Sequence, residues 1–214
     1  IYLFSGDFGA ESDGRKPLGA VHYYNRLGQR VTAGLSVPTA AGALYEVDTR
    51  LRPSGADGPL SVSLDGFALY QREDAWTWEH LALVRARPVY GSEAGRAATQ
   101  EVIAKTLLRD RDWAAFLSDA VTMRGEIAKA KPPKGALDVK LIEGGLVDLE
   151  FAVQVRQFRY PEAFDPRLAN SIKALIAGGH APETLAGDHA LLTRFLVTLR
   201  LVAPDLEDPA PASK

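Results

Sequence analysis

The pattern of apolar residues changes character near Gly91. Before that point, short segments alternate apolar and polar residues, which is the period-two pattern of β-strands. After it, apolar residues recur only at spacings of three and four, which is the helical period. The sequence therefore predicts an α+β portion over residues 1–91, an all-helical bundle over 92–203 and a flexible, proline-rich tail over 204–214.

The first portion opens with two simple elements. Residues 1–4 form a short apolar run that predicts a buried strand. A glycine-rich loop follows, and from residue 20 to 35 the apolar positions fall at spacings of 3, 4 and 4. This spacing predicts a helix with one buried face.

Two further strands are expected before the first portion ends. Residues 43–53 alternate strictly between outward polar and inward apolar side chains, and residues 60–64 alternate again after a turn. We expect these two segments to pair with each other. Asp65 is expected to cap the helix that follows, which continues or restarts through residues 75–87.

Composition excludes several classes of protein. The 214 residues include no cysteine, which rules out thiolate metal sites, thiol catalysis and disulfides. The net charge of −2 gives no support for a nucleic-acid or membrane partner. No apolar run approaches the roughly 20 residues that span a bilayer. Because the chain lacks cysteine, it fits a reducing compartment, and we expect it in the cytoplasm.

One face of the predicted strand over residues 44–52 carries only charged side chains: Glu46, Asp48, Arg50 and Arg52. Two carboxylates two residues apart suit a divalent cation, and two guanidinium groups suit phosphate oxygens. Metal beside phosphate is what nucleotidyl transfer requires. The alternative is a solvent-exposed face with cross-strand ion pairs, and periodicity alone favours that alternative.

The segment 75–87 gathers aromatic and charged residues. On a helix, Trp76, Glu79 and Leu83 share a side, with His80 at its margin. The aromatic rings could pack on a base, and Arg85 could reach phosphates. The alternative is that the tryptophans belong to the core and the charges to the surface, and the pattern alone favours it.

A third candidate segment is residues 143–151, where two glycines precede a helix. Asp148 falls in the first turns of that helix and is expected to cap it, because helix N-termini favour carboxylates. Asp148 and Glu150 could instead ligate a metal, although positions i and i+2 on a helix diverge by about 200°. Lys140, just upstream, could pair with Asp148.

Three segments together, residues 45–55 (YEVDTRLRPSG), 75–87 (AWTWEHLALVRAR) and 144–151 (GGLVDLEF), closely resemble glutamine synthetase adenylyltransferase. The resemblance runs over most of the chain and weakens after about residue 160. This bacterial family has two homologous nucleotidyltransferase halves. One removes AMP from glutamine synthetase by phosphorolysis, and the other attaches it from ATP. The form of residues 75–87 resembles the second, C-terminal, adenylylating half.

The resemblance implies a nucleotidyltransferase palm like that of DNA polymerase beta, followed by a helical domain. Such palms use two aspartates in a D-x-D motif and a third acid on a neighbouring strand, and Asp48 matches the third acid. The paired aspartates are expected immediately before Ile1, so we expect a partial palm that is inactive alone. Glu46 is an additional candidate metal ligand, and Arg50 and Arg52 are candidates for phosphate contacts.

The mechanism implied by the resemblance is direct in-line transfer. Two Mg²⁺ ions would bridge the aspartates and the phosphates of ATP, and a tyrosine hydroxyl of glutamine synthetase would attack the α-phosphorus. The expected partners are glutamine synthetase and, for the full-length parent, a nitrogen-status signalling protein of the PII type.

Three alternatives remain at this point. The chain could belong to the adenylyl-removing half, or it could be a non-catalytic regulatory or docking module with a degenerate palm. A tRNA or poly(A) nucleotidyltransferase shares the superfamily chemistry, but the near-neutral charge and the long motif matches argue against it.

Overall fold

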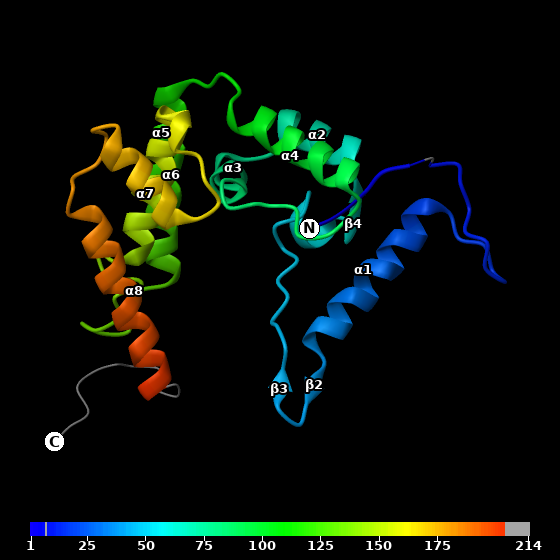
Figure 1. The fold of residues 1–214 in the computed structure, drawn as a ribbon, viewed down its shortest axis with the longest axis horizontal. Helices are drawn as coiled ribbons and strands as arrows, with labels where there is room; N and C mark the ends of the chain where they lie inside the picture. Colours follow the sequence, from blue (N-terminus) through cyan, green and yellow to red (C-terminus); the bar gives the residue numbers. More distant parts are fainter. Residues whose placement is uncertain (7, 204–214) are drawn as a thin grey trace. The chain divides into compact units, whose positions relative to one another are not determined.

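The computed structural model describes residues 1–6 and 8–203, and it is rich in helix with little sheet (Figure 1). In chain order its elements are β1 (Tyr2–Phe4), α1 (Ala20–Ser36), β2 (Pro38–Thr39), β3 (Gly42–Ala43), β4 (Ser61–Ser63), α2 (Leu64–Glu73), α3 (Thr77–Leu83), α4 (Glu93–Leu107), α5 (Trp113–Ala130), α6 (Leu146–Arg159), α7 (Leu168–Ala177) and α8 (Leu185–Val202), with single 3₁₀ turns at Gly55–Asp57 and Pro161–Ala163. This mixture agrees with the α+β class expected from the sequence.

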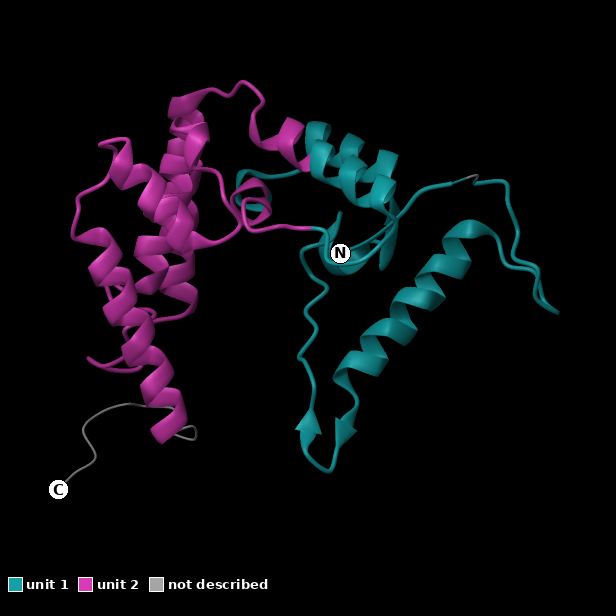
Figure 2. Ribbon diagram, viewed as in Figure 1, with its two compact units in different colours: residues 1–79, 88–102 teal, residues 80–87, 103–214 magenta. Residues whose placement is uncertain are grey.

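The chain forms two compact units, and each is discontinuous in sequence (Figure 2). Unit 1 comprises residues 1–79 and 88–102, and unit 2 comprises residues 80–87 and the described part of 103–214. Two of the borders fall within helices α3 and α4, and the third lies between Arg87 and Pro88. Gly91, the expected joint, therefore lies inside the second segment of unit 1. The expected flexible tail, residues 204–214, lies outside the described residues.

Unit 1 is built on a two-stranded parallel sheet. β1 pairs with β4 in the register Tyr2–Ser61 to Phe4–Ser63, which confirms a strand at the start of the chain. Helix α1 lies against this sheet, and a hydrogen bond of 2.8 Å joins the Tyr2 hydroxyl of β1 to the Thr32 hydroxyl of α1. Gly28 lies at a close approach of α1 to the sheet, since a Cβ there would lie 3.0 Å from the Ser61 hydroxyl oxygen.

The predicted strand over residues 44–52 is wrong. The structure has an irregular loop there, and β4 pairs with β1 instead of with that segment. A local hydrogen bond explains the difference. The Arg50 backbone N–H donates to the Asp48 carboxylate at 2.9 Å, and such side-chain bonds compete with the ladder of a sheet.

Two other expectations for unit 1 are corrected. Helix α1 forms as predicted, but its apolar stripe is not buried, since Leu27 and Val31 are 45% and 41% exposed. Ser63, not Asp65, caps α2, because its side-chain oxygen accepts from the Gly66 N–H. Asp65 lies in the first turn of that helix instead.

Unit 2 is a bundle whose centre is helix α6. Within the described residues no strand follows residue 100, so the switch to helices is confirmed. One side of α6 packs Leu149 and Val153 with α7, and Phe151 and Val155 pack beside a second cluster. The residues of that second cluster are Leu81, Phe116 and Ala120.

Helix α6 begins where a loop wraps round its first turn. Three N–H groups donate to carbonyls of that loop, Gly145 to Ile142, Leu146 to Val139 and Val147 to Lys140. Gly144 has φ of +75°, a conformation that favours glycine. A Cβ on Gly145 would lie 2.6 Å from the Val139 carbonyl oxygen. The two glycines are thus required by the backbone, and the loop carbonyls occupy donors that an anion would otherwise use.

We expect Gly145→Ala to destabilise the protein by about 2 kcal/mol, because the new methyl group overpacks against backbone oxygens that cannot move independently. The measurement is the free energy of unfolding from urea denaturation. Gly125→Ala is the matched control. Gly125 lies in α5 with open space round its Cβ position, so alanine there should stabilise by about 0.5–1 kcal/mol. Equal effects of the two substitutions would contradict the proposed close approach.

Candidate functional site

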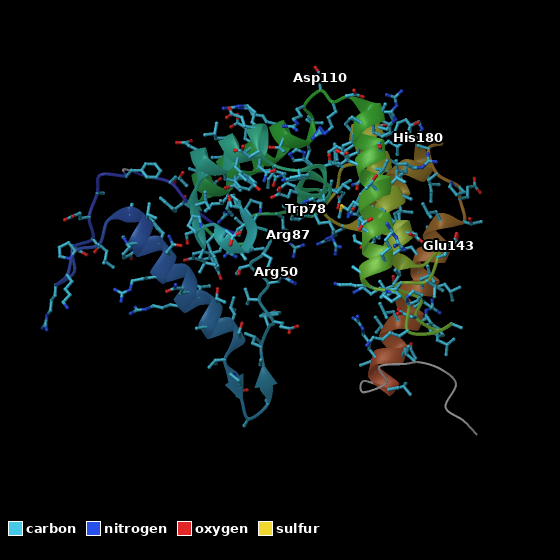
Figure 3. All side chains as sticks on the ribbon, turned by 180° about the vertical axis from the view of Figure 1, so that it is seen from behind. Arg50, Trp78, Arg87, Asp110, Glu143 and His180 are labelled. Atoms are coloured by element: carbon cyan, nitrogen blue, oxygen red, sulfur yellow. The ribbon has the colours of Figure 1, made fainter. Side chains whose placement is uncertain are left out.

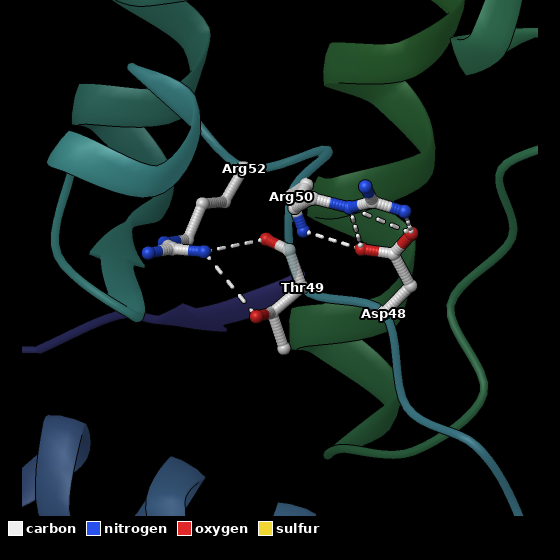
Figure 4. Close-up of polar contacts among 4 residues, drawn as sticks. All are labelled: Asp48, Thr49, Arg50 and Arg52. Carbon is white, nitrogen blue, oxygen red and sulfur yellow. Dashed lines mark hydrogen bonds and ion pairs between the residues drawn. The ribbon is translucent and has the colours of Figure 1, made fainter.

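The segment over residues 44–60, which carries Arg50 (Figure 3), contains no strand, so its charged residues do not share a strand face. Asp48 and Arg50 instead form an exposed ion pair, with the Arg50 Nη2 atom 2.6 Å from Asp48 Oδ2 (Figure 4). The side-chain hydrogen bond from Arg50 is the largest of the causes that lower the pKa of Asp48 to about 2. Asp48 is therefore fully ionised at neutral pH, as a metal ligand must be. Glu46 is exposed, and no ion pair of it is found in the described part of the chain.

Arg52 turns back into its own loop (Figure 4). Its guanidinium donates to the backbone carbonyls of Gly58, Thr49 and Ala56 at 3.2, 2.8 and 3.0 Å, and also to the Thr49 hydroxyl. These bonds close a tight turn of the chain and use all three nitrogen atoms of the fork. In this conformation Arg52 organises the loop, and its phosphate contact stays a prediction.

Glu79 joins helices α2 and α3. Its carboxylate accepts from the Trp76 backbone N–H at 2.9 Å, which is the reach-back bond of a capping box, and from the Tyr70 hydroxyl at 3.0 Å. Burial is the largest cause that raises the pKa of Tyr70, so its hydroxyl remains a donor at neutral pH. Glu79 is 8% exposed and holds this joint together.

The predicted arrangement of the 75–87 segment is wrong in two respects. Trp76 precedes the helix and is 71% exposed, so it does not share a buried side with Glu79 and Leu83. His80, expected at the margin, is 2% exposed. The reason is that α3 begins at Thr77, one residue after Trp76, which leaves the Trp76 ring outside the helical repeat.

Acidic residues of α6 pair with arginines. The Asp148 carboxylate lies in the first turn of α6, as expected, but it accepts from the Arg124 Nε atom and from the Gly144 N–H before the helix, and not from an N–H group of the helix itself. The expected partner, Lys140, is wrong, because Arg124 reaches that carboxylate from α5 and the Lys140 side chain is exposed. The Glu150 Oε2 atom lies 3.6 Å from the Arg85 Nη1 atom. These two candidate site residues therefore form an ion pair with each other.

No three histidine, aspartate or glutamate side chains in residues 1–6 and 8–203 lie close enough to hold a metal ion together. Asp48 and Glu46 thus offer carboxylates from one loop without a third acid beside them. Arg124 was not anticipated from the sequence, because its partner lies 24 residues away and no local pattern indicates the pair.

Comparisons with known proteins identify the family. Residues 1–102 match the family described as glutamate-ammonia ligase adenylyltransferase (GlnE), which confirms the resemblance carried by the motifs. Over residues 1–102 the chain is thus similar to that adenylyltransferase family.

The related enzymes are named bifunctional glutamine synthetase adenylyltransferase/adenylyl-removing enzyme. The chain is 44% identical over 213 residues to that of Brucella suis biovar 1 (strain 1330), covering 96% of this chain and 22% of the relative. It is 48% identical over 175 residues to that of Rhizobium meliloti (strain 1021), covering 82% and 17%. It is 42% identical over 204 residues to that of Stenotrophomonas maltophilia (strain K279a), covering 90% and 22%. The chain thus spans about a fifth of the length of these relatives.

Among the described residues, none of the helices combines the length and the apolar character needed to cross a membrane.

The Asp48–Arg50 pair makes a titration prediction. We expect the Asp48 carboxyl to titrate at about 2, and Arg50→Gln to return its pKa toward the ordinary value of 3.8. Since the folded pKa is lowered, the pair is complete above the ordinary pKa and is lost as the pH falls through about 2. Carboxyl-carbon NMR gives the midpoints, with Arg30→Gln in α1 as the control. If the titration midpoint of Asp48 is the same in the Arg50→Gln variant, the pairing is contradicted.

Arg52 makes a stability prediction. We expect Arg52→Ala to lower the free energy of unfolding by about 1–3 kcal/mol, because it removes charge-assisted bonds to several carbonyls. Arg52→Lys should recover little of the loss, since an ammonium group cannot span the same fork. Arg50→Ala, which breaks an exposed pair, serves as the matched control and should leave stability unchanged. Full recovery in Arg52→Lys would show that charge alone matters.

Proposed function

We propose that this chain is part of an enzyme that transfers AMP from ATP to a tyrosine hydroxyl of glutamine synthetase. The observation that supports the proposal most is the identity of 44% over 213 residues with a relative named for that activity. The motif over residues 75–87, which resembles the adenylylating half, supports this direction of transfer. Because the chain spans about a fifth of its relatives, the activity proposed is that of a longer protein.

The proposed reaction is one in-line displacement. The phenolic oxygen forms a bond to the α-phosphorus, the bond from that phosphorus to the bridging oxygen breaks, diphosphate leaves, and the phenolic proton passes to solvent. ATP would be the substrate and Mg²⁺ the cofactor, which would neutralise charge on the phosphates. The protein's own residues would align the reactants and stabilise charge.

Asp48 and Arg50 are the residues that fit these roles in the described structure. The Asp48 carboxylate is ionised and exposed, so it can ligate Mg²⁺ in place of Arg50. Exchange of this kind would release the Arg50 guanidinium, whose planar fork matches phosphate oxygens. We therefore propose that the ion pair holds both groups ready and opens when the metal nucleotide binds.

Removal of AMP is the second candidate. The relatives carry both activities in their name. In phosphorolytic removal an oxygen of inorganic phosphate would attack the phosphorus of the attached AMP, the bond to the phenolic oxygen would break, and ADP would form, which would call for a metal ligand and phosphate contacts of the same kind. A third candidate is a regulatory or docking module, which would bind glutamine synthetase or a PII-type signalling protein without chemistry.

The decisive experiment places this chain in a working enzyme. The segment of the Brucella suis relative that aligns with this chain is replaced by this chain, and AMP attachment and AMP removal are measured separately with labelled nucleotide. We expect Asp48→Asn in the hybrid to reduce attachment at least about 100-fold, since a lost charge-stabilising group costs several kcal/mol of barrier. Removal should be spared.

The control variant is Asp65→Asn, which neutralises another exposed aspartate in the same unit and should leave both activities intact. Loss of removal alone with Asp48→Asn would assign the chain to the adenylyl-removing half. If the Asp48→Asn hybrid carries out both reactions at normal rates, the regulatory or docking module is the only candidate function that remains. We expect the 214-residue chain by itself to transfer no label, because Asp48 and Glu46 have no third acid beside them in the described part.

A further inference from the structure

Helices α5 and α6 of unit 2 enclose an open groove that no activity above uses. Its volume is about 570 Å³. It is lined by side chains of these two helices and the residue that follows α6: Trp113, Leu117, Ala120, Val121, Arg124, Asp148, Phe151, Ala152, Val155, Arg156, Arg159 and Tyr160. The two helices lie side by side (Figure 1).

The groove is elongated. α5 and α6 run antiparallel, because Arg159 at the end of α6 lies over Trp113 at the start of α5, while Arg124 bonds Asp148 at the other end. The lining positions on each helix span 12 residues, so the first and last are 11 residues apart in sequence, which corresponds to about 16 Å, or three helical turns. A third helix of three turns would therefore match the groove in length.

The wall contributed by α5 is apolar and exposed. Leu117 is 40% exposed and Val121 is 65% exposed, and they lie one turn apart on the same face. Phe151, Ala152 and Val155 supply the facing wall. A single exposed apolar residue needs no explanation, whereas a continuous apolar strip along a groove is typical of a docking surface.

The rim of the groove is basic. Three arginines and one aspartate line it, and the pair of Arg124 with Asp148 cancels one charge of each sign. The Arg156 Nη1 atom donates a hydrogen bond to the His180 carbonyl. Arg159 contacts the Trp113 ring, and none of its N–H groups has a hydrogen-bond acceptor among the described residues. The groove therefore presents two uncompensated positive charges beside apolar walls.

We propose that this groove binds an amphipathic helix of a partner protein whose apolar stripe is flanked by aspartate or glutamate residues. The apolar stripe covers Leu117 and Val121, and the acidic flank pairs with Arg156 and Arg159. Helices dock in apolar grooves through residues at positions i, i+3, i+4 and i+7. A small molecule fits this groove less well, because small ligands are typically about 70–90% enclosed, and this groove is largely open. The proposal does not depend on the proposed function.

The test is a selection from a peptide library whose sequences are not biased toward acidic or apolar residues. The full chain is used to select from a displayed library of helical peptides with all surface positions randomised, and Val121→Asp protein is used to remove peptides that bind elsewhere. We expect the selected peptides to share apolar residues at helical spacing and an excess of acidic residues. Their affinity for the chain should fall as salt rises, because charge pairs contribute.

Matched variants then locate the binding. Val121→Asp should weaken the selected peptides at least about tenfold, as expected for a residue at the centre of an interface. Leu191→Asp in α8, at the same exposure of 65%, should have no effect. Arg159→Glu should weaken binding about fivefold or more, whereas Arg200→Glu, also in the last turn of a helix, should not.

Three outcomes would overturn the proposal. The selection could return no peptide that distinguishes the chain from its Val121→Asp variant. It could return peptides without an acidic excess. Sedimentation could instead show that the chain dimerises and that Val121→Asp abolishes the dimer, which would assign the groove to a second copy of this chain.

Discussion

The placement of helix α6 is the constraint on which unit 2 depends. It packs Leu149 and Val153 against α7, and Phe151 and Val155 lie beside the cluster that includes α5. A helix buried on two sides cannot shift along its axis without opening both contacts, because protein interiors are closely packed. Its start is fixed by carbonyls of the preceding loop, and its first turn is held by the pair of Asp148 and Arg124. The position of the groove follows from these contacts.

A buried polar group secures the other end of α6. Gln157, which is 1% exposed, donates to the Ala163 carbonyl and to the Ser171 hydroxyl at 3.1 and 2.8 Å. The Ser171 hydroxyl in turn donates to the Asp165 carbonyl. Each of these groups would be costly to bury without a partner, so the network specifies how the turn between α6 and α7 runs.

Helices with a long apolar repeat can be predicted from the sequence. The positions of side chains that are held by a single contact cannot. The helices after Gly91 follow from apolar spacing because burial of one stripe decides their packing. The alternation over residues 44–52 was misleading, since local bonds of Asp48 and Arg52 organise a loop and no partner strand pairs with it among the described residues. The family was recognisable from motif residues, whereas the pair of Asp148 with Arg124 crosses between helices and leaves no local signal.

The motif residues differ in how readily they can exchange partners. Glu79 is buried and accepts from two donors, so removing it from them would leave those donors without a partner at a high energetic cost. Asp48 and Arg50 meet in solvent, where an ion pair contributes little to stability and opens at little cost. A group that must release one partner to take a metal or a phosphate is best placed in such a pair. That difference, rather than the number of charges in a motif, separates the groups available for chemistry from those that hold the fold.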